Sequence, residues 1–311
     1  MCRWAYPATH IVRNWLTVVN GVLSQIFVKE QDRDLSSSRI STRVSKTSKT
    51  ILQVLVVSLL FASRAFTQQF DAHAEQQLVQ LINQERARAG LPSLEVEDRL
   101  TQAAREHSAL MVQAKQLSHQ VGDEPKLSQR LAATGLHFNN DAENVAYDQN
   151  VEGAHIGLMH SPGHRENILS PLYNTVGVGV VRSGEVLWVT EDFANRMPEY
   201  SADEAESTII AAWQRERRRA NNPPTAVTRV PQLRRMACAM GKRGELDTRS
   251  PLGLPEVRSA AAYTQSDPAT LPSNAVKKAH DPSVRRIGVG ACFADGPRFP
   301  AGVWWVLMAF H

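Results

Sequence analysis

Four side chains in the middle of the chain are of types that could do chemistry together. They are three histidines and one glutamate: His119, Glu143, His160 and His164. Neutral imidazoles and a carboxylate are ligands that a divalent transition metal such as zinc prefers. A histidine beside a carboxylate could equally form a proton-transfer pair, since the unperturbed pKa of histidine is about 6.5. These residue types therefore predict a metal site or an acid–base pair, provided that the fold brings them together.

The residues between His160 and His164 decide whether these two histidines can share a helical face. The tripeptide Ser-Pro-Gly occupies 161–163; proline lacks a backbone donor, and glycine permits unusual dihedral angles. We expect a helix to stop here and to leave His164 on irregular backbone, where a rigid scaffold can present it for function. The alternative is a hydrogen-bonded structural histidine. His107 lies inside an apolar helical pattern and is expected to be a packing residue.

Helices followed by a strand hairpin must position these side chains. Apolar residues recur on one helical face after Ala74, Gly90 is placed to end that helix, and Asp98 is placed to cap a second one. The other expected elements are helices at 127–134 and 151–160 and strands at 142–147, 175–181 and 186–190. The last two strands are joined by a short polar run and predict an antiparallel hairpin. Helices before a hairpin favour a layered α+β domain.

The first part of the chain has the pattern of an export signal. The chain is 311 residues long, enough for about two domains, and its 42% apolar and 21% charged residues are typical of a globular protein. A mostly apolar run at 51–62 follows Lys46 and Lys49 and precedes small residues. This predicts a leader at 1–65 with a signal peptide at 44–65, too short for a permanent membrane span. We expect export to the periplasm or the exterior, and a true start near residue 44, so that the upstream stretch is a misassigned extension.

The charge of the remaining chain argues against nucleic-acid binding. Residues 66–311 carry 26 basic and 28 acidic side chains, a net charge of −2. The two halves differ, with −8 over 66–200 and +6 over 201–311. Opposite charges could favour docking of the acidic part on the basic part. Independently solvated surfaces are the alternative.

Two cysteines, Cys238 and Cys292, lie beyond the leader. An even pair in an oxidising compartment could form a disulfide. Sequence spacing does not decide this, and two buried free thiols are the alternative.

The sequence of the second half of the chain resembles a degenerate repeat of the first half. Residues 205–219 follow 74–88 at an offset of 131, and Leu233–Met240 is expected to mirror Leu100–His107. The runs 287–290 and 305–310 repeat 176–179 and 188–193. Matches in the same order predict a second domain of the same kind. Since residues 242–282 contain no counterpart of the stretch around His164, we expect an intact domain at 66–198 and a degenerate copy at 199–311.

Five ordered motifs resemble the bacterial branch of the CAP superfamily, named after cysteine-rich secretory proteins, antigen 5 and pathogenesis-related proteins. They are Leu117–His119, Glu143–Tyr147, Met159–Leu169, Val176–Gly179 and Trp188–Phe193. Residues 83–92 also resemble the opening helix of this family. The resemblance is strong over 72–195 and weak over 203–311. It implies a three-layer α-β-α sandwich with a central cleft, and usually export.

The cleft of that family carries two histidines and two glutamates, and motifs in this chain match three of them. The resemblance implies that His119, His164 and Glu143 line the cleft and would be the ligands of a divalent cation such as zinc. The second glutamate would stand near Ser161, so this chain departs from the full set. A water could complete a three-ligand site. His160 is expected to be peripheral.

Three functions remain open at this point. The one we favour is an exported, non-catalytic binding module that holds a divalent metal, a lipid or a cell-envelope ligand. The second is a metal-assisted or His/Glu-dependent hydrolase of peptide or cell-wall material, with Ser118, Ser161 or a metal-bound water as the attacking group. The third is a structural or interaction protein with a vestigial cleft. No nucleophile-elbow or paired metal-ligand helix motif supports the hydrolase.

Overall fold

The computed structural model describes residues 70–311, so the expected leader (1–65) and signal peptide (44–65) lie outside the described residues. Residues 67–311 cluster as one unit, in which two four-stranded sheets each organise a lobe. We call α3 to β4 (72–196) the first lobe and α8 to β8 (202–310) the second lobe. In the described part of the chain, no helix has the length and apolar character needed to cross a membrane.

The sheet of the first lobe is built around the expected hairpin. Its strands, in spatial order, are β1 (Glu95–Val96), β3 (Thr175–Ser183), β4 (Val186–Arg196) and β2 (Phe138–Asp148). β1 runs parallel to β3, and the other neighbours are antiparallel. Gly184 adopts a φ of 61° in the β3–β4 turn, a conformation that favours glycine. β2 extends beyond the expected 142–147 and forms one edge of the sheet.

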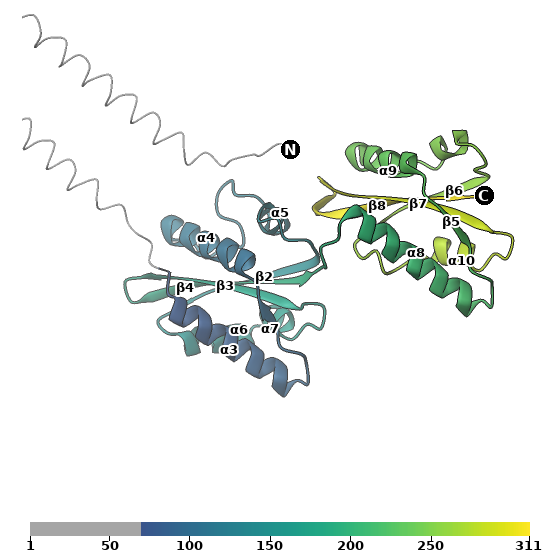
Figure 1. Cartoon of the computed structure of the whole chain (residues 1–311). Coiled ribbons are helices and arrows are strands. Elements are labelled where there is room, and N and C mark those ends of the chain that lie inside the picture. Colours follow the sequence, from purple (N-terminus) through teal and green to yellow (C-terminus); the bar gives the residue numbers. More distant parts are fainter. Residues whose placement is uncertain (1–69) are drawn as a thin grey trace, which may run out of the picture. The chain divides into compact units, whose positions relative to one another are not determined.

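Helices cover both faces of this sheet, so the predicted three-layer α-β-α sandwich is confirmed (Figure 1). α4 (Asp98–Ala114) and α5 (Leu127–Ala133) lie on one face, and α3 (Ala72–Arg88), α6 (Val151–His160) and α7 (Pro162–Ile168) on the other. Fully buried side chains fill both interfaces, including Leu78, Ile82, Phe193, Leu100 and Leu131. Burying such side chains is the main favourable term that holds the layers together.

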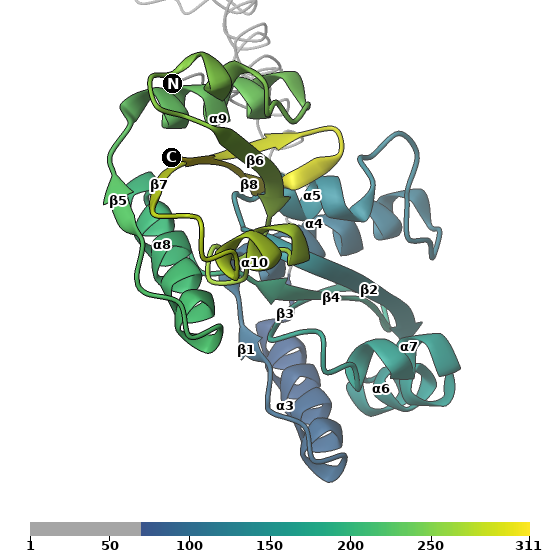
Figure 2. The same ribbon diagram turned by 90° about the vertical axis from the view of Figure 1, so that its right-hand side faces the viewer.

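Two expectations about helix ends were wrong. The side chain of Glu97, not Asp98, caps α4 by accepting a hydrogen bond from Arg99 N, and Asp98 is the first helical residue. The chain also does not stay irregular after Ser161, because a new helix, α7, begins at Pro162 and contains His164. Proline suits the first position of a helix, where no N–H partner is needed and its φ is already helical. Figure 2 shows α6 and α7 packed together beside β2.

The second lobe has the same strand order and the same strand directions. Its helices are α8 (Ala202–Arg219), α9 (Pro231–Arg243), the 3₁₀ turn η1 (Ser250–Gly253) and α10 (Ser273–Ala279). Its strands, in spatial order, are β5 (Ala226–Thr228), β7 (Arg286–Gly296), β8 (Phe299–Phe310) and β6 (Ser259–Gln265). Only β5 and β7 are parallel. α9 covers one face, and α8 and α10 the other (Figure 1).

A buried arginine makes the same contacts in both lobes. Arg86 of α3 donates from Nε to Pro92 O and from Nη1 to Ile168 O and Ser170 O, at 2.8–2.9 Å. Arg217 of α8 donates in the same way to the carbonyl oxygens of Pro223, Ala279 and Asp281. These residues lie at the expected offset of 131. Each guanidinium satisfies carbonyls that would otherwise be buried without a donor, at a cost of about 1–3 kcal/mol each.

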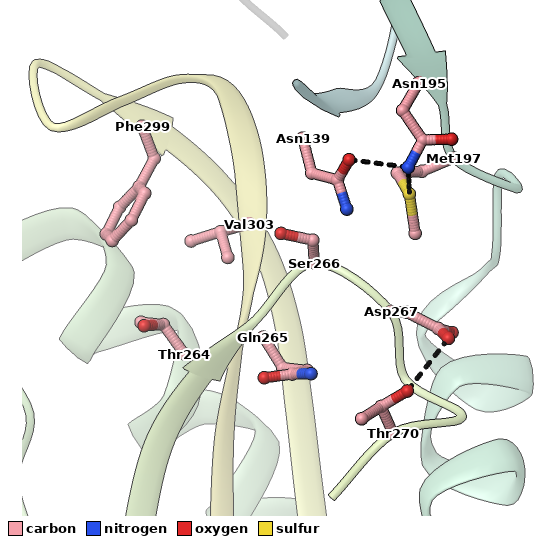
Figure 3. A pocket seen from close by; sticks show the side chains of 10 residues that line it. All are labelled: Asn139, Asn195, Met197, Thr264, Gln265, Ser266, Asp267, Thr270, Phe299 and Val303. Atoms are coloured by element: carbon pink, nitrogen blue, oxygen red, sulfur yellow. Dashed lines mark hydrogen bonds between the residues drawn. The ribbon is translucent and has the colours of Figure 1, made fainter. Parts of the chain in front are cut away.

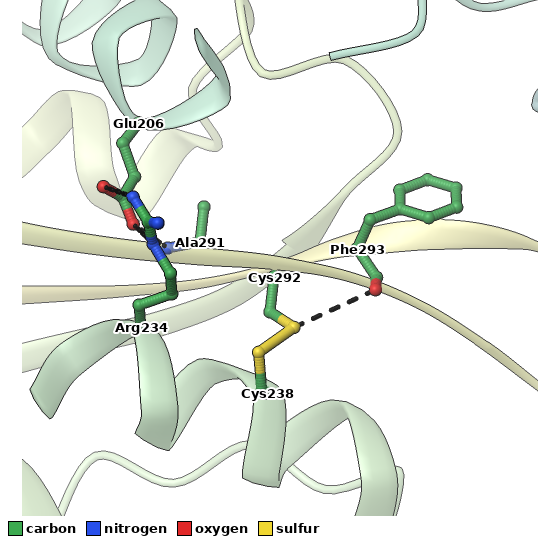
Figure 4. The surroundings of a disulfide bond; sticks show 6 residues. All are labelled: Glu206, Arg234, Cys238, Ala291, Cys292 and Phe293. Carbon is green, nitrogen blue, oxygen red and sulfur yellow. Dashed lines mark hydrogen bonds and ion pairs between the residues drawn. A yellow bond between two sulfur atoms is a disulfide. The ribbon is translucent and has the colours of Figure 1, made fainter. Parts of the chain in front are cut away.

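The structure corrects the expected alignment of α9 with α4. Arg105 pairs with Glu75, whose carboxylate also accepts from Val180 N. Figure 4 shows the matching set in the second lobe, Arg234 with Glu206 and Ala291 N. Residues 233–240 therefore correspond to 104–111, not to Leu100–His107. The error is four residues, about one helical turn, and such a shift leaves the pattern of apolar positions almost unchanged.

A disulfide joins Cys238 of α9 to Cys292 of β7 (Figure 4). Their Cα atoms are 5.0 Å apart, within the usual range for a disulfide. The bond closes a loop between residues 54 positions apart and fixes one helical layer of the second lobe to its sheet.

Apolar and aromatic contacts join the two lobes. The His137 ring stacks on Phe293 with centroids 4.1 Å apart, and Ala301 packs against the core beneath α5. No ion pair of the described residues joins one lobe to the other; Arg99 pairs with Glu199 in the connecting segment, and Arg182 with Asp71 directly before α3. Among the described residues, no ion pair between the two lobes supports docking of the acidic part on the basic part.

We predict that Cys238→Ala/Cys292→Ala lowers the free energy of unfolding by about 2–4 kcal/mol, because the unfolded chain regains the freedom of the opened loop. Urea denaturation of residues 67–311 measures this. Dithiothreitol should bring the wild-type protein to the stability of the variant and should leave the variant unchanged. Equal stability of the oxidised wild-type protein and the variant would contradict the prediction.

Candidate functional site

Three different elements bring His119, Glu143 and His164 together at the edge strand β2. His119 lies in the segment between α4 and α5, Glu143 in β2 and His164 in α7. His119 Nδ1 lies 2.9 Å from Glu143 Oε1, a hydrogen-bonding distance. The ring of His164 lies with its centroid 6.2 Å from that of His119, at an angle of 50°. The two rings come from the two helical layers and meet around one edge of the sheet.

The buried carboxylate of Glu143 is paired with a positive charge and is hydrogen-bonded. Its side chain is 2% exposed, and Arg130 of α5 donates from Nη2 to Oε2 at 2.5 Å. Arg130 Nη1 also lies 3.7 Å from Glu124, a second carboxylate with a side chain 6% exposed. Both oxygens of Glu143 are therefore engaged, one by His119 and one by Arg130. Its role in this arrangement is to orient the His119 ring.

His107 anchors the segment that carries His119. It is 1% exposed in α4, as expected for a packing residue, and both of its ring nitrogens have polar partners. Nε2 lies 2.9 Å from Ser118 O, the carbonyl directly before His119, and Nδ1 lies 2.9 Å from Glu124 Oε1. The buried ring thus holds the segment at two points.

Asn144 holds the other histidine from the opposite face of β2. Consecutive residues of a strand point to opposite faces, so Asn144 faces α7 while Glu143 faces α4 and α5. Asn144 Nδ2 donates to His164 O at 3.2 Å and to Glu191 Oε2 at 3.0 Å. Asn167 of α7 donates to Asn144 Oδ1 at 2.9 Å. One amide therefore fixes the short helix that presents His164.

Two buried acids of β4 lie directly opposite this pair. Asp192 is the cross-strand neighbour of Glu143, and Glu191 that of Asn144. Burial, and then the negative charge of Glu143, raise the pKa of Asp192 well above its ordinary value. Burial raises the pKa of Glu191 to about 7, although the hydrogen bond from Asn144 opposes this rise. A protonated Asp192 adds no second negative charge beside Glu143.

The two histidines differ in their affinity for protons. The hydrogen bond with Glu143 raises the pKa of His119, and burial opposes this rise. Burial lowers the pKa of His164, and the positive charge of His119 lowers it further. The His119 side chain is 59% exposed, so the ring reaches solvent. At neutral pH the pair therefore combines a more basic imidazole with a neutral one.

The donor set offers a metal ion two nitrogens and no free carboxylate. Among residues 70–311, no group of three or more His, Cys, Asp or Glu side chains is arranged as a metal site. His160 is exposed at the end of α6, and Ser161 is the N-cap residue directly before α7. A carboxylate that accepts from one ring nitrogen while the other faces a ligand is a common support for metal-binding histidines. His119 has this support from Glu143, whereas the ring of His164 has no carboxylate partner among the described residues.

Six residues of this site were not predicted as site residues from the sequence: Glu124, Arg130, Asn144, Asn167, Glu191 and Asp192. For Asn144 a signal existed, since the period of two along a strand places it on the face opposite Glu143. For Arg130 and Asp192 there was none, because their contacts depend on how α5 and β4 lie against β2.

We predict that Glu143→Gln lowers the pKa of His119, because the charged partner of the protonated ring is lost. NMR titration of the His119 Hε1 proton measures this, and Glu152→Gln, an exposed acid of α6, is the matched control. A raised folded-state pKa gives stability that is fully present below the unfolded value of about 6.5 and is lost as the pH rises through the folded value. The variant should lack that contribution. An unchanged His119 pKa in Glu143→Gln would contradict the prediction.

Comparisons with known proteins place residues 79–193 in one family. This segment matches the model of CAP, the cysteine-rich secretory protein family. The uncharacterized protein YkwD of Bacillus subtilis is 32% identical over 123 residues, which are 39% of this chain and 47% of YkwD. The uncharacterized membrane protein YlbC of the same organism is 33% identical over 125 residues, 40% of this chain and 35% of YlbC.

This chain thus spans between about a third and a half of the length of these two relatives. A crystal structure of an extracellular protein containing an SCP domain from Bacillus anthracis is 29% identical, covers 40% of this chain and 41% of its own, and has a TM-score of 0.38. The family match spans the hairpin and all three residues His119, Glu143 and His164. The first lobe of this chain is a CAP domain, a member of the cysteine-rich secretory protein family.

Proposed function

We propose that this protein is exported and that its CAP domain (66–198) is a non-catalytic binding module whose ligand docks on His119 and His164. The observation that carries the proposal is the 2.9 Å contact of His119 with buried Glu143, next to the His164 ring. Three elements and a set of buried polar contacts hold these rings, although the rings themselves contribute little to the core. Such support for two accessible imidazoles is expected of a binding site.

Export is supported by two observations that do not depend on the site. The leader pattern at 44–65 is that of a secretory signal peptide. The disulfide between Cys238 and Cys292 is of a kind that persists in oxidising compartments. We propose that the degenerate copy (199–311) is exported together with the CAP domain and lacks a site of its own.

A divalent cation such as zinc is the ligand that the donor set supports best. His119 Nδ1 is held by Glu143, so Nε2 is the nitrogen that faces outward. The His164 ring makes no hydrogen bond with the described residues. Two imidazoles with water as the remaining ligands would hold zinc more weakly than a closed four-ligand site. For a lipid or an envelope ligand, the chain offers exposed apolar side chains at Leu117, two residues before His119, and at Tyr147, four residues after Glu143 in β2.

A hydrolase is less well supported. Ser118 Oγ is engaged with Gln120, and Ser161 Oγ makes no capping hydrogen bond. Among the described residues, neither hydroxyl is hydrogen-bonded to a histidine, as a serine nucleophile with its base would be. The site therefore contains orienting groups for a ligand without a paired nucleophile.

We predict that zinc binds residues 67–311 with a heat that isothermal titration calorimetry detects and that His119→Ala/His164→Ala abolishes. His160→Ala, which removes an exposed histidine a few residues from the site, should bind as the wild-type protein does. Because a metal ligand must lose its proton, binding should weaken as the pH falls below the raised pKa of His119. Equal heats from the wild-type protein and the double variant would show that His119 and His164 do not bind zinc.

A further inference from the structure

A polar cavity of about 430 Å³ lies away from the histidine pair, and residues of both lobes line it (Figure 3). Asn139 of β2 and Asn195 of β4 contribute from the first lobe. Thr264, Gln265 and Ser266 contribute from the end of β6 and the residue after it. A volume of this size is within the range of small-molecule sites, which is about 300–1,000 Å³.

The side chains around this cavity have unused hydrogen-bonding capacity. Asn195 Nδ2 donates to Asn139 Oδ1 at 2.8 Å, and Asn140 donates to the same oxygen at 2.9 Å. This leaves the Asn139 amino group and the Asn195 carbonyl oxygen for a ligand. The side chains of Gln265 and Ser266 are half-buried and make no hydrogen bond with the described residues. The cavity therefore offers donors and acceptors in similar number.

The lining of this cavity carries little charge. Asp267 is the one ionisable side chain among the lining residues, and no Lys, Arg or His side chain accompanies it. Its two oxygens accept from Ala269 N at 2.9 Å and Thr270 Oγ1 at 3.2 Å, and so stabilise the turn in which it lies. Among the lining residues a phosphate or carboxylate would find no cation, because the guanidinium of Arg298 lies over the Phe299 ring, and a cation would compete with these internal donors. The ligand is therefore neutral.

One part of the cavity is apolar. Phe299 and Val303 of β8 line one side, and Met197 lies near Asn195 on the other (Figure 3). A neutral ligand that suits this lining has an apolar face together with groups that both donate and accept hydrogen bonds. Saccharide rings have this combination, because C–H groups form their faces and each hydroxyl at the rim is both a donor and an acceptor.

We propose that this cavity is a binding site for a neutral saccharide of one or two rings. Gln265 and Ser266 of the second lobe, with Asn139 and Asn195 of the first, hydrogen-bond its hydroxyls, and Phe299 contacts a ring face. The site would need both lobes, which gives the second lobe a role in binding although it lacks the histidine pair. It is separate from the proposed site at His119, and either can fail without the other.

Saturation-transfer difference NMR on residues 67–311 tests this with three neutral disaccharides: maltose, cellobiose and N,N′-diacetylchitobiose. We expect transfer to at least one of them. Gln265→Ala/Ser266→Ala removes two unengaged polar side chains and should raise the dissociation constant about tenfold or more. The matched control, Gln113→Ala/Ser183→Ala, removes an exposed amide and an exposed hydroxyl far along α4 and β3. It should bind as the wild-type protein does.

Several outcomes would overturn the proposal. One is the absence of transfer to all three disaccharides. Another is equal binding by the wild-type protein and Gln265→Ala/Ser266→Ala, which would place the saccharide elsewhere. Binding of tetra-alanine that depends on Gln265 and Ser266, without saccharide binding, would make this a peptide site. His119→Ala/His164→Ala should bind the disaccharide normally, so the result does not depend on the metal proposal.

Discussion

The alternation of side chains along the edge strand β2 is the constraint on which the site depends. Glu143 points toward α4 and α5 and orients His119, while the next residue, Asn144, points toward α7 and holds the His164 carbonyl. Because the two residues are adjacent in one strand, the sheet sets the relation between the two helical layers at this point. A strand in the middle of the sheet could not do this, since its neighbours would separate the layers. The histidines meet because β2 lies at an edge.

Burying Glu143 requires that its charge be managed from several sides. Taking a carboxylate out of water costs several kcal/mol unless it is paired and hydrogen-bonded. Arg130 supplies a positive charge next to the Glu143 carboxylate, and His119 adds a second one when its ring is protonated. Burial raises the pKa of the neighbouring Asp192, which favours the neutral form of that acid. The buried carboxylate, in turn, gives an exposed imidazole a defined orientation and a raised pKa. One ion pair thus links the burial of this carboxylate to the protonation of an exposed imidazole.

The second lobe keeps the contacts that build the fold and lacks those that build the site. Arg217, Glu206 and Arg234 repeat the roles of Arg86, Glu75 and Arg105. At the sheet positions that correspond to Glu143, Asn144 and Asp192 stand Ala260, Ala261 and Ala309. Replacing a complete buried polar network by apolar residues can be neutral or stabilising, whereas removing one member is costly. This explains how the same layered architecture can form without such a site.

The sequence alone determined the local elements and the identity of the first lobe. Apolar periodicity placed α3, α5, α6 and the β3–β4 hairpin, and the ordered motifs pointed to the three residues that meet at the site. Where local patterns are degenerate, the sequence misled: a shift of one helical turn preserves the apolar face, so α9 was aligned four residues away from its true counterpart in α4. A Ser-Pro-Gly run ends one helix and can also start another, and the packing of α7 against β2 decided between these outcomes.

Only the tertiary structure decided which polar groups are partners. Arg130 reaches Glu143 because α5 packs against β2, and Asp192 faces Glu143 because of the strand register. Cys238 and Cys292 could have remained free thiols, but α9 brings them to a bonding distance across the face of the second sheet. Such pairings join residues far apart in the chain, and their geometry follows from how layers pack, which no local propensity encodes.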